Sequence, residues 1–140
     1  MITQAESLAI ATTQPTVEQY FRDFNREAYD AVASLFHAEG VLRPPFEEGI
    51  TGPDAICTYL KQEAKGMRAT PLEVTTTALG EGHRQVVVQG KVKALVFMVN
   101  VRWTFVLNED NLIVDAHIKL LASLQELMQI NQGEKSELEV

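Results

Sequence analysis

The sequence predicts an α+β domain in which a curved antiparallel sheet wraps around N-terminal helices to form a cone. Two observations carry this prediction. Apolar residues before Pro71 recur with helical spacing, whereas those after it alternate with polar residues. The chain has 140 residues, of which 46% are hydrophobic and 22% charged, and these values are typical of one globular domain with one core. We expect residues 1–140 to form that domain, with 1–14 and 133–140 flexible.

The first helix is expected to begin at Thr16. Thr16 and Gln19 have the spacing of a capping box, and Pro15 favours a boundary just before them. Four apolar residues with the spacing i, i+3, i+4 and i+7 then predict one buried stripe: Val17, Tyr20, Phe21 and Phe24.

Two further helices are expected before the period changes. One begins near Asn25 or Asp30 and ends at Gly40, a residue type suited to the left-handed cap position. The prolines of Arg43-Pro44-Pro45-Phe46 then favour extended backbone. The third helix begins near Pro53 and is expected to direct four side chains inward: Ile56, Tyr59, Leu60 and Met67.

The second half of the chain predicts strands. Alternation begins at Leu72, Gly80-Glu81-Gly82 predicts a turn, and a β-rich run extends from Gln85 to Leu107. Within that run Gly90 is expected to weaken or bend the strand. A further strand is expected from Leu112 to Leu120, followed by a short C-terminal helix that opens at Ser123 with a capping box.

The segment Ala94–Val99 must contain a turn if its flanking strands pair. It offers no Gly, Asn, Asp or Pro, so the turn would have an apolar tip made of Leu95, Val96, Phe97 and Met98. One interpretation is an exposed patch that a partner subunit or an apolar ligand covers. The simpler alternative is a longer strand that folds back under the helices.

Two aromatic residues are candidates for ligand binding. Trp103 shares the apolar side of its strand with Val99, Val101, Phe105 and Leu107, and Tyr20 lies on the apolar stripe of the first helix. Both rings can serve as core packing. Alternatively, the O–H of Tyr20 and the N–H of Trp103 point into the cone and bind one carbonyl oxygen. The periodicity leaves both possibilities open.

The most enzyme-like pattern is Asp115-Ala-His117, a carboxylate beside an imidazole. Val114, Ala116, Ile118 and Leu120 form the apolar side of the same strand, so Asp115 and His117 are expected on the opposite face. We therefore interpret them as surface residues. The three histidines lack metal-ligand spacing, and the single cysteine, Cys57, provides neither a disulfide nor a thiolate zinc site.

The overall charge excludes one class of partner. A net charge of −7, with scattered basic residues, disfavours nucleic-acid binding. The chain shows neither an N-terminal secretion signal nor an apolar run long enough to span a bilayer, so we expect a cytoplasmic protein.

Several stretches in the same order resemble the C-terminal domain of the cyanobacterial orange carotenoid protein and its free-standing homologues. They are VEQYFRDFNREAYD, GVLRPPFEEGITG, VVVQGKVKA, VNVRWTFVLN and IKLLASLQEL, and they extend from about Thr16 to Ile130. The resemblance implies the fold of the nuclear transport factor 2-like superfamily, which agrees with the predicted cone.

The resemblance also implies a ligand and a site. In that family a helical tyrosine and a strand tryptophan bind the keto oxygen of a ketocarotenoid, of the canthaxanthin or echinenone type, and Tyr20 and Trp103 occupy the matching positions. The tunnel lining implied by the same match is Phe24, Met67, Val92, Phe97 and Ile118. Glu63 matches a glutamate that bridges two domains in the full-length photoprotein. Between the GKV segment and the tryptophan strand this chain is four residues shorter than the family pattern.

We expect from this resemblance a non-enzymatic, photoprotective carotenoid carrier. It would quench singlet oxygen, pass pigment to helical carotenoid-binding proteins and contact membranes transiently during pigment uptake. One cone covers about half of a carotenoid, so a homodimer holding one pigment molecule is expected, with the 95–98 tip in the contact and the helix from Ser123 as a lid. The alternatives are an isomerase or dehydratase that acts on a small apolar substrate, and a dimerising interaction module.

Overall fold

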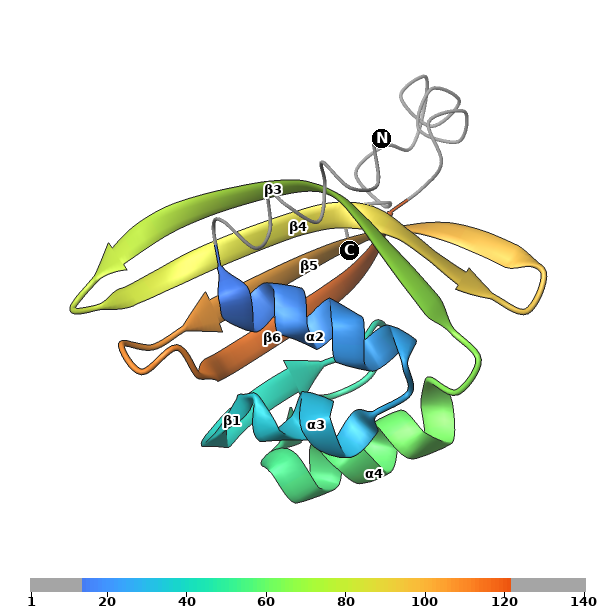
Figure 1. The fold of residues 1–140 in the computed structure, drawn as a ribbon, viewed down its shortest axis with the longest axis horizontal. Coiled ribbons are helices and arrows are strands. Elements are labelled where there is room, and N and C mark those ends of the chain that lie inside the picture. The colour runs from blue at the N-terminus through green and yellow to red at the C-terminus, as the bar shows by residue number, and fades with distance from the viewer. Residues whose placement is uncertain (1–13, 122–140) are drawn as a thin grey trace.

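The structure is a computed structural model that describes residues 14–121. In this part of the chain, three α-helices lie on the concave side of a six-stranded sheet (Figure 1). The helices are α2 (Pro15–Asn25), α3 (Tyr29–Ser34) and α4 (Pro53–Glu63). The strands are β1 (Phe36–Arg43), β2 (Ile50–Thr51), β3 (Arg68–Gly80), β4 (His83–Ala94), β5 (Phe97–Leu107) and β6 (Ile113–Leu121). The predicted α+β class is confirmed.

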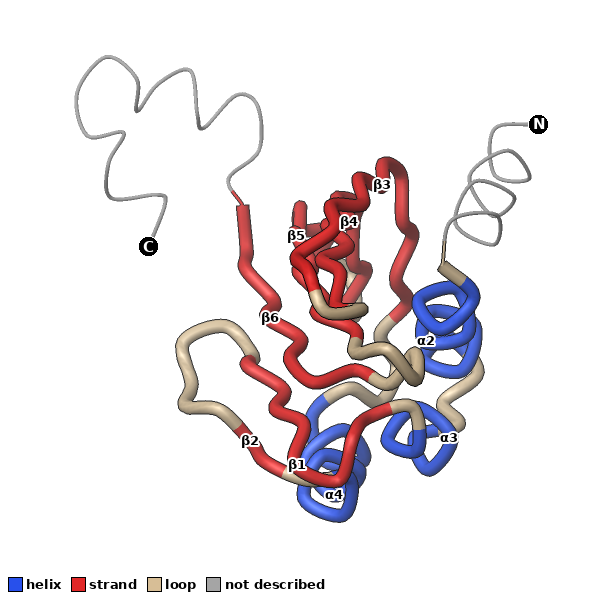
Figure 2. The backbone as a smooth tube through the Cα atoms, turned by 90° about the vertical axis from the view of Figure 1, so that its left-hand side faces the viewer, coloured by secondary structure: helices blue, strands red, loops and turns tan. Residues whose placement is uncertain are grey.

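The sheet is mixed rather than wholly antiparallel. Its strand order is β2-β1-β6-β5-β4-β3, and every neighbouring pair is antiparallel except β1 with β6. The parallel pair joins Leu42 to Ala116 and brings the first strand of the chain beside the last one described. Seen from the side, the strands curve around the helices (Figure 2).

The helix α2 begins one residue earlier than predicted and without the capping box. Pro15 occupies the first helical turn, where its missing N–H costs nothing. Thr16 Oγ1 donates instead to the carbonyl of Asn111 at 2.8 Å, and Gln19 Nε2 donates to Asp23 Oδ1 at 2.9 Å. The predicted stripe is confirmed, because Val17, Tyr20, Phe21 and Phe24 are all buried.

The predicted second helix is wrong beyond Ser34. The segment Phe36–Arg43 is strand β1, because β6 offers it backbone partners; the amide of Ile113 donates to the carbonyl of Leu35 at 2.9 Å. Gly40 is not a helix cap. A Cβ there would lie 2.6 Å from the carbonyl oxygen of Ile113, so glycine permits the close approach of the two strands.

The β-rich run divides into β4 and β5, joined at Leu95-Val96. Leu95 has φ of +58°, a left-handed conformation that a tight turn requires, and both turn residues are exposed. The apolar tip is therefore confirmed, and the alternative of one longer strand is wrong. The predicted alternation of β5 is confirmed too, since Val101, Trp103, Phe105 and Leu107 are buried.

The predicted helix from Ser123 lies outside the described residues. The same holds for the termini expected to be flexible, apart from Gln14. No helix within residues 14–121 is long and apolar enough to cross a membrane.

Candidate functional site

A cavity of about 270 Å³ lies between the helices and the concave face of the sheet. Its floor comes from β4, β5 and β6, and its roof from α2 and α4. The wall is apolar apart from a few side chains with polar atoms: Tyr20, Tyr59, Glu63 and Trp103. Such a cavity suits an apolar ligand that has few polar atoms.

The structure brings nearly all of the predicted site residues together. The lining includes Tyr20, Phe24, Met67, Val92, Trp103 and Ile118. Phe97 is not among the lining residues; its side chain is 66% exposed at the β4–β5 turn. It has the same parity on β5 as Val99, Val101 and Trp103, so it extends the apolar face of the strand beyond the cavity.

Tyr20 has the most unusual environment in the cavity wall. Its ring is buried edge-on to Phe105 at a centroid distance of 5.0 Å and stacked on Phe24 at 6.1 Å. Its hydroxyl is buried and has no hydrogen-bond partner in the described part of the chain. A buried, unpaired hydroxyl costs about 1–3 kcal/mol, so an acceptor placed there would be bound favourably.

The protonation state of Tyr20 suits a hydrogen-bond donor. Burial, and secondarily the neighbouring Tyr59, raise the pKa of the Tyr20 hydroxyl far above its ordinary value. The hydroxyl therefore stays protonated at any physiological pH. The site matches a neutral acceptor such as a carbonyl.

Trp103 reaches the cavity from the middle of β5. It is 3% exposed, and Phe21 holds its ring edge-on at a centroid distance of 4.8 Å. Trp103 pairs with Val88 on β4 and with Ile118 on β6, so both neighbouring strands fix its position. The sequence alternation predicted this inward orientation.

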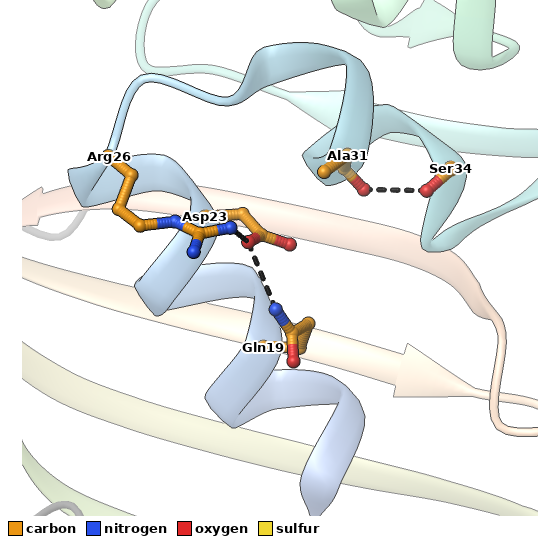
Figure 3. Close-up of polar contacts among 5 residues, drawn as sticks. All are labelled: Gln19, Asp23, Arg26, Ala31 and Ser34. Atoms are coloured by element: carbon orange, nitrogen blue, oxygen red, sulfur yellow. Dashed lines mark hydrogen bonds and ion pairs between the residues drawn. The ribbon is translucent and has the colours of Figure 1, made fainter.

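A polar cluster within α2 lies outside the cavity lining. Asp23 is 2% exposed, and its Oδ1 accepts hydrogen bonds from Arg26 at 2.7 Å and Gln19 at 2.9 Å (Figure 3). A buried carboxylate is tolerated when it is paired in this way. These i, i+4 and i, i+3 contacts link successive turns at the C-terminal end of α2, the helix that carries Tyr20.

Sequence reasoning missed one wall of the cavity. Pro44 and Pro45 were expected only to extend the backbone, yet they line the cavity. Tyr59, expected to point inward, lines the cavity, and its hydroxyl donates to Glu47 Oε2 at 3.3 Å. Desolvation, then the charge of Glu47, raise the pKa of Tyr59 to about 12. The only sequence feature that could have indicated this wall is that Pro44-Pro45 comes just before the acidic pair Glu47-Glu48.

The enzyme-like pair lies elsewhere. Asp115 accepts a hydrogen bond from Arg43 Nε at 2.7 Å, and His117 is exposed on the outer face of β6. This confirms the outward orientation that parity predicted. In residues 14–121 no group of three or more His, Cys, Asp and Glu side chains is arranged to hold a metal ion.

The chain resembles proteins with known ligands and folds. Residues 17–116 match the SnoaL-like domain family. An orange carotenoid-binding protein of Limnospira maxima is 32% identical over 122 residues, and one of Synechocystis sp. is 32% identical over 120 residues. These alignments cover 84% and 83% of this chain but 38% of each relative, so the chain spans about two-fifths of their length.

Solved structures agree. The orange carotenoid protein of Anabaena (Nostoc) sp. PCC 7120, a structure binding canthaxanthin, has a TM-score of 0.77 and 32% identity, covering 84% of this chain and 39% of that one. The Fremyella diplosiphon protein has a TM-score of 0.76 and 30% identity, covering 83% and 38%. The chain therefore belongs to the SnoaL-like domain family, has the nuclear transport factor 2-like fold, and is homologous to the C-terminal domain of orange carotenoid proteins.

Proposed function

We propose that the cavity binds one end ring of a ketocarotenoid, of the canthaxanthin or echinenone type. The hydroxyl of Tyr20 and the indole N–H of Trp103 donate to the keto oxygen. One observation carries the proposal: the hydroxyl of Tyr20 is buried in an apolar cavity without a partner in the described residues. Homology to a protein that binds canthaxanthin supports this ligand over other apolar carbonyl compounds.

The size of the cavity fits one end of such a ligand. Pockets that enclose a whole drug-sized molecule measure about 300–1,000 Å³. This cavity, at about 270 Å³, encloses an end ring and leaves most of the polyene outside. Each Å² of apolar polyene left in water costs about 25 cal/mol.

A second copy of the chain would cover that polyene. We propose that the loaded protein is a homodimer with one carotenoid lying across a two-fold axis between two cavity mouths. Release of the pigment then accompanies separation of the copies. This arrangement suits a cytoplasmic photoprotective carrier that quenches singlet oxygen and transfers carotenoid to helical carotenoid-binding partners.

The cavity chemistry supports a binding protein over an enzyme. Among the described lining residues there is no histidine and no aspartate, and the one carboxylate, Glu63, belongs to an exposed residue at the end of α4. General acid–base catalysis needs a positioned proton-transfer group. In the family, the glutamate that matches Glu63 bridges two domains. In this chain Glu63 is a charged residue at the rim of the cavity.

The test is a visible spectrum of the full chain mixed with canthaxanthin. Donors at the keto oxygen polarise the conjugated system, so the wild type should form a complex with red-shifted absorption. Tyr20→Phe and Trp103→Phe should each reduce the shift, and the double variant should lose it. Tyr29→Phe is the matched control, because Tyr29 is buried but is not among the cavity-lining residues, and its hydroxyl already donates to the carbonyl of Ala64. Absence of any complex, or an unchanged shift in the double variant, would falsify the proposal.

A further inference from the structure

The β4–β5 turn carries an exposed apolar tip. Leu95 is 85% exposed, Val96 86%, Phe97 66% and Met98 59%. The hairpin extends beyond the helices at one end of the molecule (Figure 1). Four consecutive large apolar residues at this exposure form a contiguous patch, and such a patch marks an interaction surface.

Basic residues lie on the strands that lead to the tip, although the chain as a whole is acidic. Segments 64–72 and 90–108 contain no Asp or Glu, against a net charge of −7 for the chain. They carry Lys65, Arg68, Lys91, Lys93 and Arg102. None of these five is in an ion pair with another residue of 14–121. These two segments therefore carry an excess of positive charge.

Two of these cations lie directly opposite one another. Arg68 on β3 pairs with Lys93 on β4, and both side chains are exposed. Like charges across a strand pair destabilise a sheet. An anionic partner would remove this repulsion, which gives the surface a preference for negative charge.

We propose that this hairpin docks the pigment-free protein onto an anionic lipid bilayer. Residues 95–98 enter the interface between headgroups and acyl chains, while Arg68, Lys91 and Lys93 contact anionic headgroups. The purpose of docking, uptake of pigment from the bilayer, rests on the proposed function. The docking itself requires no pigment.

The geometry of β4 and β5 connects the tip to the cavity. Val92 and Ala94 precede the tip on β4, Val99 follows it on β5, and all three line the cavity. A tip held in the bilayer therefore places the cavity wall next to the acyl region. An apolar end ring moving from lipid to cavity would pass along this apolar strand face without crossing bulk water.

Charge favours a bilayer over a second copy as the occupant in the pigment-free state. Two copies meeting tip to tip would bring the same cations together, and like charges at an interface cost several kcal/mol. The apolar tip also argues against a nucleic acid as the partner, because a nucleic-acid backbone offers no apolar phase in which residues 95–98 could be buried.

The experiment is vesicle flotation of the full-length, pigment-free chain. One set of vesicles is phosphatidylcholine alone, and the other contains three parts in ten phosphatidylglycerol. Each lysine near an anionic surface contributes about 1 kcal/mol. Lys91→Gln with Lys93→Gln should therefore weaken partition into anionic vesicles by about thirtyfold. Thr75→Glu with Thr77→Glu, at exposed positions farther along β3, lowers the net charge equally and should have a much smaller effect.

The apolar part is tested separately. Val96→Ser with Phe97→Ser should abolish binding, whereas Leu79→Ser, at an exposed leucine near the other hairpin, should leave it unchanged. Three outcomes would overturn the proposal: equal binding to both vesicle types, no binding to either, or a Val96→Ser, Phe97→Ser variant that still binds lipid but no longer self-associates. Because the vesicles hold no pigment, this outcome is independent of the spectrum that tests carotenoid binding.

Discussion

The side chain of Asn25 and the backbone of Ala69 exchange two hydrogen bonds. Asn25 Nδ2 donates to the carbonyl of Ala69 at 2.8 Å, and the amide of Ala69 donates to Asn25 Oδ1 at 2.7 Å. The pair fastens the end of α2 to the start of β3, and Ala69 itself lines the cavity. It fixes the roof of the site to an edge strand of the sheet.

Asn25→Ala should lower the free energy of unfolding by about 2–4 kcal/mol. Both backbone groups of Ala69 lose their partner, and each unsatisfied buried group costs about 1–3 kcal/mol. Urea denaturation followed by tryptophan fluorescence measures the change. Ser34→Ala, which removes an exposed hydrogen bond to the carbonyl of Ala31, should cost less than about 0.5 kcal/mol. A loss in Asn25→Ala as small as in this control would show that the pair does not fasten α2.

Tyr20→Phe should leave the pigment-free protein equally stable or more stable by up to about 2 kcal/mol. The substitution removes a hydroxyl that pays a desolvation cost without a hydrogen bond and keeps the ring contacts with Phe24 and Phe105. Thermal or urea unfolding without carotenoid measures it. Tyr29→Phe, which breaks a 2.9 Å bond to Ala64, should instead destabilise by about 1 kcal/mol. A destabilised Tyr20→Phe would mean that the hydroxyl has a partner in the pigment-free protein.

Local patterns predicted most of the fold, because most elements follow from the spacing of apolar residues. The stripe of α2 and the alternation of β5 needed no knowledge of the rest of the chain. Strand β1 did not follow from spacing. Its segment, Phe36–Arg43, forms a strand because β6, more than seventy residues away in the sequence, supplies a parallel partner. A short stretch of sequence around β1 does not reveal that partner.

The candidate site shows the same division. Parity placed Val92, Trp103 and Ile118 inward, and family resemblance paired Trp103 with Tyr20. Phe97 has the inward parity too, but β5 continues past the helices, so Phe97 stays 66% exposed within residues 14–121. Pro44 and Pro45 became part of the wall through packing against elements distant in sequence, which no short motif records.

Gly90→Ala should destabilise the protein by about 3 kcal/mol. A Cβ at this position would lie 2.1 Å from the carbonyl oxygen of Thr70, and the β3–β4 register shifts between Pro71 and Glu73, beside this contact. The colliding atom is backbone, so the two strands must separate locally. Urea denaturation of the variant checks this, and an unchanged midpoint would show that the strands move apart freely. Gly90 was predicted to weaken or bend the strand; in the structure it allows the backbones of β3 and β4 to approach closely.

Alkaline titration should show that all three tyrosines ionise above the ordinary pKa of about 10. Burial is the first cause in each case: it raises the pKa of Tyr20 and Tyr29, and it raises that of Tyr59 to about 12 with the help of Glu47. Phenolate absorbance at 295 nm should therefore appear at higher pH in the folded protein than in urea, where it should appear near pH 10.

The same shifts predict how stability depends on pH. A folded-state pKa above the unfolded value means that the fold favours the neutral phenol. That contribution is complete below about pH 10 and is lost as the pH rises towards the folded values, about 12 for Tyr59. The urea midpoint should fall across this window, and Tyr59→Phe should fall less steeply because one raised group is gone. A midpoint that stayed constant from pH 9 to 11.5 would contradict the burial of these hydroxyls.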